Sequence, residues 1–304
     1  MVPFLRAEAI RVLSRPSAID YNEPCIIKNA IAHWPALREH KWHPRRLQAL
    51  YGERLFERGI CAHNDEPLLT SLNRFFRRKH PRTRRRCYVF DSTFDADCPE
   101  LLDDYNIPAI FQFGSQLSPT CHPAPCANHS NRWWLVGHAG SGSQLHADPV
   151  TTSAWNALVF GTKEWVVVQP EQTEDHSLPM NHLSLPSVRC SGHDHYKRMR
   201  EVAASTPLHR WFRKHVPWLW RHASCVASLS RNLDVNRTIG TSSSAIPRMM
   251  RFTQRPGDIV YVPSGWQHAV LNTSLSVAVT HNFISPTAAV LKGIIGGGDK
   301  DGVA

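Results

Sequence analysis

The 304-residue sequence predicts a mainly β protein built around one antiparallel barrel or jelly roll. Short runs of strand length recur on both sides of a central segment, and Gly-Ser-Gly and Gly-Thr turn signals separate them. Both strand-rich blocks carry no net charge. The segment between them, residues 171–251, has twelve basic and six acidic residues and 7 of the 18 histidines. Two strand blocks that flank an insertion suit a barrel that closes on itself.

The expected strands are short apolar or alternating runs bounded by turn residues. In chain order they are Pro24–Ile27, Tyr88–Phe90, Arg132–Gly137, Gln144–Ala147, Ala154–Val159, Glu164–Gln169, Asp258–Val262, Ala269–Leu271 and Ser276–Asn282. The Pro-Gly turn at Pro256 marks where the second block is expected to begin.

Four segments have a helical pattern. Pro99–Tyr105 begins with proline and carries acids in its first turns, which is typical of a helix start. The helix expected at Leu68–Lys79 would place Leu72, Phe75 and Phe76 on one side. The other two are Pro44–Tyr51 and Leu208–Trp220. We expect a loop at residues 113–131 and partial disorder in the insertion.

These elements predict three regions. Residues 1–85 form a mixed, partly helical N-terminal support that leads into a basic segment at residues 74–86. Residues 86–284 form the barrel, interrupted by the insertion at about 171–251. Residues 285–304 form a short C-terminal tail.

The formal net charge of +10 is unevenly distributed, which excludes a uniformly basic coat on nucleic acid. Residues 74–86 hold eight basic and no acidic side chains, and residues 87–104 hold six acidic and no basic ones. The basic segment is either a nuclear-localisation or nucleic-acid contact, with Phe75 and Phe76 available for stacking, or a solvated helix face with both rings in the core. The acidic stretch either attracts a basic peptide or is a solvated loop.

Cysteine usage and hydropathy predict an intracellular protein, with the nucleus favoured and the cytoplasm possible. The eight cysteines form no Cys-x-x-Cys, so we expect free thiols in a reducing compartment. No stretch approaches the ~20 apolar residues of a membrane span, and no secretory signal is expected. Two weak zinc-like clusters are Cys121, His122, Cys126 and His129, and Cys190, His193 and His195.

His146 and Asp148 carry the chemistry that the sequence suggests first. On a strand, residues i and i+2 point to the same face, so this imidazole and carboxylate can approach one point. His268, at the end of a strand in the second block, would complete a two-histidine, one-carboxylate triad, which suits non-haem Fe(II). The alternative is that a His-x-Asp pair arises by chance and packs as ordinary strand residues.

A metal with open positions can chelate a 2-oxo acid, whose far carboxylate then needs a cation and hydroxyl donors. Lys163 is the candidate cation, expected on a strand next to the metal strand, in an apolar and aromatic stretch. Asn156, Ser143 and Thr280 are further polar positions on expected strands. For all four, the alternative is an ordinary strand residue that faces solvent or alternates with apolar neighbours.

The stretches TSAWNAL, VPSGWQH and VLN, within two longer blocks at residues 86–170 and 252–284, resemble the JmjC (jumonji-C) family of Fe(II)/2-oxoglutarate oxygenases. The resemblance is strongest to the branch that contains arginine demethylases and lysyl hydroxylases. A weaker similarity covers residues 21–37. The resemblance implies a double-stranded β-helix, the cupin or jelly-roll barrel, with surrounding helices.

The same resemblance implies roles for single residues. His146, Asp148 and His268 would hold iron, and Lys163, helped by Thr280, would pair with the far carboxylate of 2-oxoglutarate. Asn156 and Ser143 would contact the co-substrate, with Ser143 standing where the branch has threonine. Tyr88 and Asn282 would line the pocket. The insertion is longer and richer in histidine than in the branch, and the branch continues with dimerisation helices, which leaves the oligomeric state open.

The implied activity is a dioxygenase that uses O2 and 2-oxoglutarate to hydroxylate a protein side chain, giving succinate and CO2. A lysyl target in a Lys/Arg-rich protein or peptide is favoured, with N-methyl demethylation of arginine or lysine, as in histone demethylases, as the variant. Two other functions stay open: a nucleic-acid-binding or scaffold protein with an inactive barrel, and a small-molecule oxygenase on the same fold. Inactive members of the family usually lack a metal ligand or the lysine. This sequence keeps all four residues: His146, Asp148, His268 and Lys163.

Overall fold

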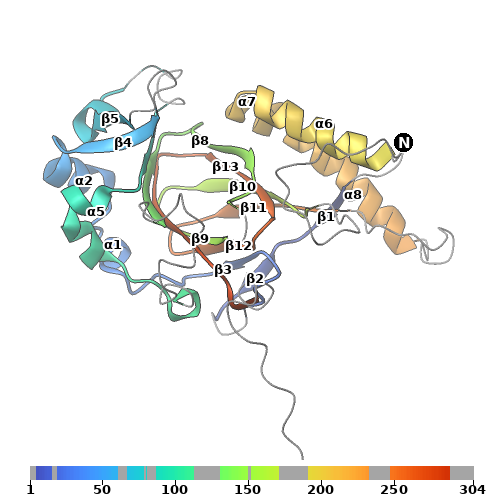
Figure 1. Cartoon of the computed structure of the whole chain (residues 1–304), viewed down its shortest axis with the longest axis horizontal. Coiled ribbons are helices and arrows are strands. Elements are labelled where there is room, and N and C mark those ends of the chain that lie inside the picture. Colours follow the sequence, from blue (N-terminus) through green and yellow to red (C-terminus); the bar gives the residue numbers. More distant parts are fainter. Residues whose placement is uncertain are drawn as a thin grey trace, which may run out of the picture.

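The computed structural model describes residues 5–15, 19–60, 67–78, 80, 87–112, 131–149, 152–170, 191–232 and 247–287. Two sheets face each other in these residues, and helices pack outside both of them (Figure 1). No helix in the described part of the chain is long and apolar enough to cross a bilayer.

The first sheet has five strands in the order β1-β11-β10-β13-β8. Their bounds are β1 (Arg6–Glu8), β11 (Arg248–Gln254), β10 (Lys163–Val168), β13 (Gln267–Asn272) and β8 (Gly142–His146). All neighbours are antiparallel except β1 and β11. The second sheet has seven strands in the order β2-β3-β12-β9-β14-β7-β6. These are β2 (Arg11–Leu13), β3 (Cys25–Ile27), β12 (Ile259–Val262), β9 (Ser153–Phe160), β14 (Ser276–Phe283), β7 (Arg132–Gly137) and β6 (Tyr88–Asp91).

The chain alternates between the two sheets as it runs from β7 to β14. Each strand crosses to the opposite sheet, except that β10 and β11 are neighbours in the first sheet. This winding is a double-stranded β-helix, so the predicted fold class is confirmed. The inner faces meet in an apolar cluster that includes Trp165, Val167, Val260 and Val262.

Small elements from the N-terminal part and the β6–β7 connection cover the second sheet. They are α1 (Pro35–Arg38), α2 (Pro44–Tyr51), the hairpin β4 (Leu55–Ile60) and β5 (Pro67–Ser71), α3 (Leu72–Phe76), α5 (Phe94–Asp97) and the 3-10 helices η2 (Pro99–Asp104) and η3 (Ala109–Phe111). Large aromatic side chains fill this layer. Trp134 and Trp155, from β7 and β9, contact Trp42 and Trp34, respectively.

Three helices cover the outer face of the first sheet (Figure 1): α6 (Ser191–Ser205), α7 (Leu208–Lys214) and α8 (Val216–Asn232). Trp211 and Phe212 of α7 share a buried cluster with Val166 and Val168 of β10. Because both strand faces of β10 are buried, it has an almost continuous apolar run rather than alternation.

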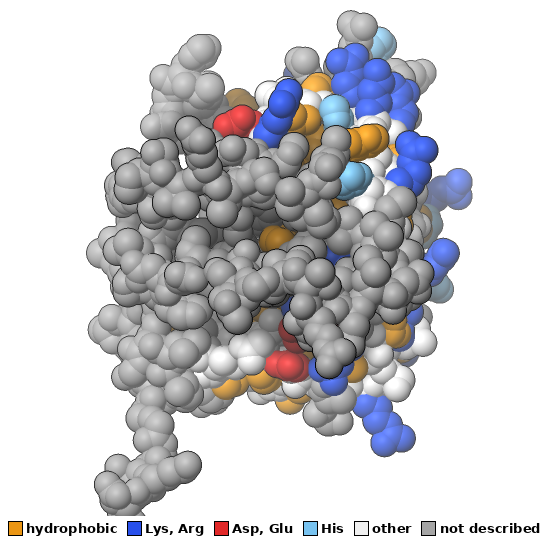
Figure 2. Space-filling view, turned by 90° about the vertical axis from the view of Figure 1, so that its right-hand side faces the viewer, with side chains coloured by type: hydrophobic (Ala, Val, Ile, Leu, Met, Phe, Trp, Pro, Cys, Tyr) orange, Lys and Arg blue, Asp and Glu red, His pale blue; other side chains and the backbone are white. Residues whose placement is uncertain are grey.

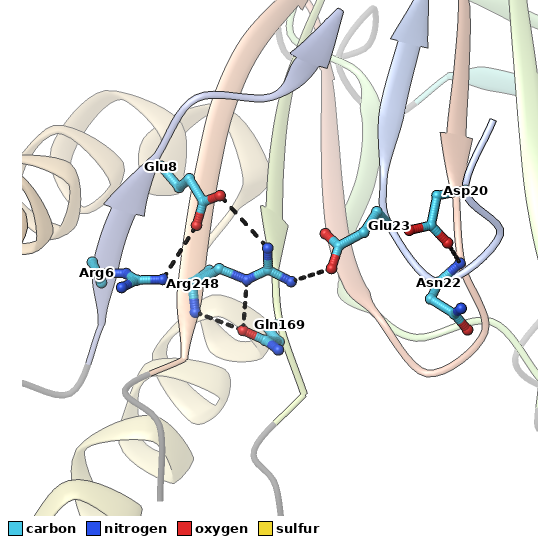
Figure 3. Close-up of polar contacts among 7 residues, drawn as sticks. All are labelled: Arg6, Glu8, Asp20, Asn22, Glu23, Gln169 and Arg248. Atoms are coloured by element: carbon cyan, nitrogen blue, oxygen red, sulfur yellow. Dashed lines mark hydrogen bonds and ion pairs between the residues drawn. The ribbon is translucent and has the colours of Figure 1, made fainter. Parts of the chain in front are cut away.

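Arg248 ties the two sheets together at one end (Figure 3). It lies on β11, and its guanidinium contacts Glu8 of β1 at 3.6 Å and Glu23, just before β3, at 2.8 Å. It also donates to the Gln169 side chain at 2.9 Å and lies over the Trp266 ring. One side chain therefore joins both sheets.

Several sequence predictions need correction. The helix expected at Leu68–Lys79 is the strand β5 followed by the short helix α3, because Ser71 accepts a hydrogen bond from the Arg74 backbone and starts the helix there. Pro99–Asp104 is a 3-10 helix. The helix expected at Leu208–Trp220 is two helices that meet at His215.

The insertion also differs from the prediction. Residues 191–232 form the helices α6, α7 and α8, and the barrel resumes at Arg248, in β11, before the Pro-Gly turn. Residues 171–190 and 233–246 lie outside the described residues, so the expectation of partial disorder in the insertion stays a prediction. The cysteines among the described side chains, Cys25, Cys87 and Cys98, are buried free thiols, as predicted. The side chains of both zinc-like clusters and most of the basic segment lie outside the described residues. The predicted region boundaries stay predictions.

Candidate metal and co-substrate site

Two strands of the first sheet bring the predicted metal ligands together. His146 ends β8 and pairs directly with His268 of β13, and Asp148 follows His146 on the same face. Asp148 lies 3.9 Å from the Nε2 atom of each histidine. One ligand atom from each of the three residues lies within 4.8 Å of the others. Among the described residues, this is the one group of histidine, cysteine and acidic side chains with such spacing.

Backbone carbonyls orient both imidazoles. The Nδ1–H of His146 donates to the Gln144 carbonyl at 2.7 Å, and that of His268 donates to the Trp266 carbonyl at 3.4 Å. Metal-ligating histidines commonly donate their second ring nitrogen in this way, which leaves Nε2 as the ligand atom. Burial, followed by the neighbouring His146, lowers the pKa of His268 to about 4, so the ring is neutral at pH 7. The donor set therefore fits a divalent metal.

Lys163 lies at the buried end of the same cavity. It begins β10, four residues before Val167, the residue that pairs with His268. Its side chain is 1% exposed, and its one hydrogen bond in the described structure goes to Asn156 Oδ1 at 3.4 Å. Burial lowers the pKa of the ammonium group to about 7. A buried cation without an acidic partner among the described residues fits the carboxylate of a bound ligand.

The cavity measures about 400 Å³ and joins these two features. All nine residues that the sequence analysis singled out line it: Tyr88, Ser143, His146, Asp148, Asn156, Lys163, His268, Thr280 and Asn282. One expectation differs in detail. The strand of Lys163 neighbours β13, which carries His268, and is not next to β8, which carries His146.

The other polar side chains come mainly from the second sheet. Asn156 of β9 pairs with Thr280 of β14, whose hydroxyl donates to the Trp155 carbonyl at 2.9 Å. Ser143 lies on β8 opposite Val270. Burial raises the pKa of the Tyr88 hydroxyl, which stays protonated and available as a donor. These groups offer donors between the buried ammonium and the histidines.

The sequence analysis did not identify the aromatic wall of the cavity. Phe90 of β6 is 42% exposed and stacks on Trp133 of β7, with ring centroids 5.4 Å apart. Trp165 of β10 completes the aromatic lining. Period-2 alternation could have found Phe90, because it shares a face with Tyr88, two residues earlier.

Several residues of the basic segment and of the acidic stretch at residues 87–104 are buried and stabilise the fold. Phe75 is fully buried and stacks on His138, so the suggested role in base stacking is wrong for this ring. Asp104 is buried against Trp42 and Lys41. Asp91 is buried and accepts hydrogen bonds from backbone N–H groups of Glu57 and Thr93.

Comparison with known proteins agrees with this geometry. Residues 15–288 match the model of the cupin-like domain family, so the chain belongs to that family. The resemblance to JmjC oxygenases is confirmed by relatives across most of the chain.

Three relatives illustrate the similarity. The chain is 27% identical to "Arginine-specific demethylase JMJ22" of Arabidopsis thaliana, over 87% of this chain and 42% of the relative. It is 28% identical to "Bifunctional arginine demethylase and lysyl-hydroxylase psr-1" of Caenorhabditis briggsae, over 86% of this chain and 56% of the relative. It is 27% identical to human "2-oxoglutarate and iron-dependent oxygenase JMJD4", over 51% of this chain and 27% of the relative. The chain thus spans about half or less of each relative.

Proposed function

We propose that this chain is an Fe(II)- and 2-oxoglutarate-dependent dioxygenase that hydroxylates a side chain of a protein substrate. The observation that carries the proposal is the cavity itself. It has two imidazoles and a carboxylate at one end, and at the other a buried ammonium group that has no acidic partner among the described residues. The relatives' names support the same cofactors and reaction class.

His146, Asp148 and His268 would hold the iron as its protein ligands. With iron, O2 and the 2-oxo acid bound, the site supplies oxidation of an unactivated C–H bond, and the co-substrate leaves as succinate and CO2. Lys163 binds the far carboxylate of 2-oxoglutarate. The apolar side chains around it keep water away and strengthen this contact.

Asn156, Thr280, Ser143 and Tyr88 orient the co-substrate as hydrogen-bond partners. The Thr280 hydroxyl rotates away from the Trp155 carbonyl to donate, or accepts a hydrogen bond where it stands. Ser143 keeps the hydroxyl of the threonine found in the related branch. Asn282 lies on β14 two residues from Thr280 and contacts the substrate or co-substrate.

The aromatic wall supports a lysyl or arginyl target. The flat faces of Phe90 and Trp133 can pack against the aliphatic stem of such a side chain and attract its cationic end. We favour lysyl hydroxylation over N-methyl demethylation, and a Lys/Arg-rich substrate. The exposed acids Asp97, Glu100 and Asp103, near β6, add attraction for a basic peptide. Nuclear or cytoplasmic location stays a prediction.

A peptide assay tests the proposal. The chain is incubated with Fe(II), 2-oxoglutarate, O2 and a basic peptide that contains one lysine, and succinate and peptide mass are measured. We expect coupled succinate formation and gain of one oxygen atom by the peptide, both lost in Asp148→Ala and kept in Glu201→Ala, which removes an exposed acid of α6. Succinate formed with a metabolite but with no peptide would favour the small-molecule oxygenase. No turnover by folded protein would favour the inactive barrel.

A further inference from the structure

The outer face of α6, α7 and α8 is strongly basic (Figure 2). Lys and Arg side chains gather along the upper right of this face, together with histidines. The exposed basic residues of these helices are Arg198, Arg200, Arg210, Arg213, Lys214 and Arg221. Among the described side chains of the three helices, Glu201 is the one acid. The barrel strands beneath these helices do not share this excess of positive charge.

These cations are not neutralised by the described part of the protein. Elsewhere, arginines pair with carboxylates, as Arg132 does with Asp95 and Arg251 with Glu164. The six basic residues of the helical face have no ion pair within the described residues, and Arg221 donates to a backbone carbonyl. Arg210, Arg213 and Lys214 lie three and four residues apart on α7, a spacing at which like charges repel. The face therefore favours an anionic partner.

An exposed tryptophan lies on the same helices. Trp218 of α8 is 49% exposed, the highest exposure of any tryptophan among the described side chains. Its ring stacks on His222, with centroids 5.5 Å apart and planes 6° from parallel. This stack fixes the orientation of the indole, and about half of the side chain remains exposed to solvent. Trp218 follows Lys214 by four residues and precedes Arg221 by three, so an aromatic face stands among the cations.

We propose that this face, defined by Arg198, Arg200, Arg210, Arg213, Lys214, Trp218 and Arg221, binds single-stranded nucleic acid. Cations that track a phosphate backbone and an aromatic ring that stacks on a base are the two elements of such sites. An acidic protein would use the charges but not the exposed indole. A duplex keeps its bases stacked on each other, so they cannot reach Trp218.

The face adjoins the strand of the metal site without being part of it. The Gln144 side chain of β8 donates to the carbonyls of Ala204 and Thr206, at the corner between α6 and α7. The helices that carry the basic face therefore pack directly on β8. Binding requires neither iron nor 2-oxoglutarate, so His146→Ala should bind nucleic acid as the wild type does.

Fluorescence anisotropy with a labelled single-stranded 12-mer RNA, at several KCl concentrations, tests the proposal. Each phosphate contact contributes about 0.7 to the slope of log affinity against log salt. The triple variant Arg210→Ala, Arg213→Ala, Lys214→Ala should lower this slope by about 2 and weaken binding at least about tenfold. The matched triple Arg11→Ala, Arg15→Ala, Arg45→Ala removes the same charge from exposed positions elsewhere and should stay within about twofold.

Trp218 provides the second, charge-independent readout. Trp218→Ala should weaken RNA binding about tenfold with an unchanged salt slope, and Trp218→Phe should retain most of the affinity. Circular dichroism confirms that each variant is folded. Three results would each overturn the proposal: no binding by the wild type, an equal loss in the matched control triple, or equally tight binding of duplex RNA or polyglutamate.

Discussion

Lys163 lies in a buried environment that disfavours its charge. A buried ammonium without an acidic partner destabilises a folded protein, and its lowered pKa, about 7, expresses that cost. Proteins retain such groups mainly at functional sites, where a ligand supplies the missing charge. The buried ammonium therefore lowers the stability of the free protein and favours the binding of a carboxylate.

Lys163→Met should therefore raise the free energy of unfolding at pH 7 by about 1–3 kcal/mol and strongly weaken 2-oxoglutarate binding. Urea unfolding and equilibrium binding measure the two effects. Lys28→Met is the matched control, because Lys28 contacts the buried carboxylate of Asp258 at 2.6 Å and its loss leaves that charge unpaired. It should destabilise the fold. Destabilisation by both variants would contradict the account of Lys163.

His281 gives a prediction about pH. Burial, followed by the Arg132 charge, lowers its pKa from 6.5 to about 3, so the folded protein binds fewer protons than the unfolded chain between these values. The free energy of unfolding should fall as pH falls through this window, by up to about 1.4 kcal/mol per pH unit from this group. His281→Gln, which can still contact Tyr105, should flatten the profile between pH 4 and 6. The control His33→Gln, at an exposed position, should leave the profile unchanged. An unchanged profile in His281→Gln would show that His281 does not cause this pH dependence.

At the scale of elements, the pairing of β8 with β13 assembles the metal ligands. Gly142 begins β8 with φ of 144°, and a Cβ there would lie 1.9 Å from the Val270 carbonyl oxygen of β13. Only glycine allows this close approach of the two backbones. The register shift between His268 and Val270 lies in the same pairing.

Gly142→Ala should push β8 away from β13 and separate His146 from His268. We expect unfolding free energy to drop by about 2 kcal/mol or more and Fe(II) affinity to fall at least tenfold. Gly265→Ala is the control, since Gly265 also has a positive φ, 80°, but nothing within 4 Å of the added Cβ. Gly265→Ala should lower the free energy of unfolding by about 1 kcal/mol and leave the Fe(II) affinity unchanged. Equal iron affinity in Gly142→Ala would show that this register does not position the ligands.

Elements with strong local signals were predictable, and those decided by tertiary contacts were not. The strands between Arg132 and Val168 follow from apolar runs and glycine turns. The strand β11 was missed because its sequence, RMMRFTQ, mixes charges that pair with Glu8, Glu23 and Glu164 across the sheet. The helix α3 starts later than its apolar spacing indicates because Ser71 caps it.

The nine residues proposed from the sequence all line the cavity, whereas the wall of Phe90 and Trp133 was not proposed. Metal and carboxylate chemistry restricts residue types strongly, so those positions can be found by motif and resemblance. An aromatic wall uses residues that are equally common in the core. Alternation with Tyr88 places Phe90 on the cavity face, and its exposure in the folded chain distinguishes it from a core residue.

For the whole molecule, the two sheets must keep a fixed separation for Lys163, on one sheet, and Asn156 and Thr280, on the other, to bind one small molecule. Arg248 contributes to this by joining β11 to Glu23, next to β3, across the open end of the sheets (Figure 3). Helices α6, α7 and α8 pack on the outer face of the first sheet, and the smaller N-terminal elements pack on the outer face of the second. Six exposed basic side chains of the described residues lie on one of these outer layers, on α6, α7 and α8.

Arg248→Met should lower the free energy of unfolding by about 1–2 kcal/mol, a modest value because Glu8 and Glu23 are partly exposed. Arg248→Lys should recover only part of the loss, since a lysine cannot contact both carboxylates and Gln169 at once. Arg6→Met, which removes an exposed pair with Glu8, is the control and should change stability by less than about 0.5 kcal/mol. Full rescue by lysine would contradict this role.

Anaerobic titration of the folded protein with Fe(II) and then 2-oxoglutarate, followed by visible absorption, tests the central claim most directly. The account predicts a weak charge-transfer band that requires both components and saturates at stoichiometric amounts. His146→Ala should abolish the band, and Lys163→Met should suppress it by weakening the binding of 2-oxoglutarate. Absence of the band in folded wild-type protein, or its persistence in His146→Ala, would contradict the assignment of the site.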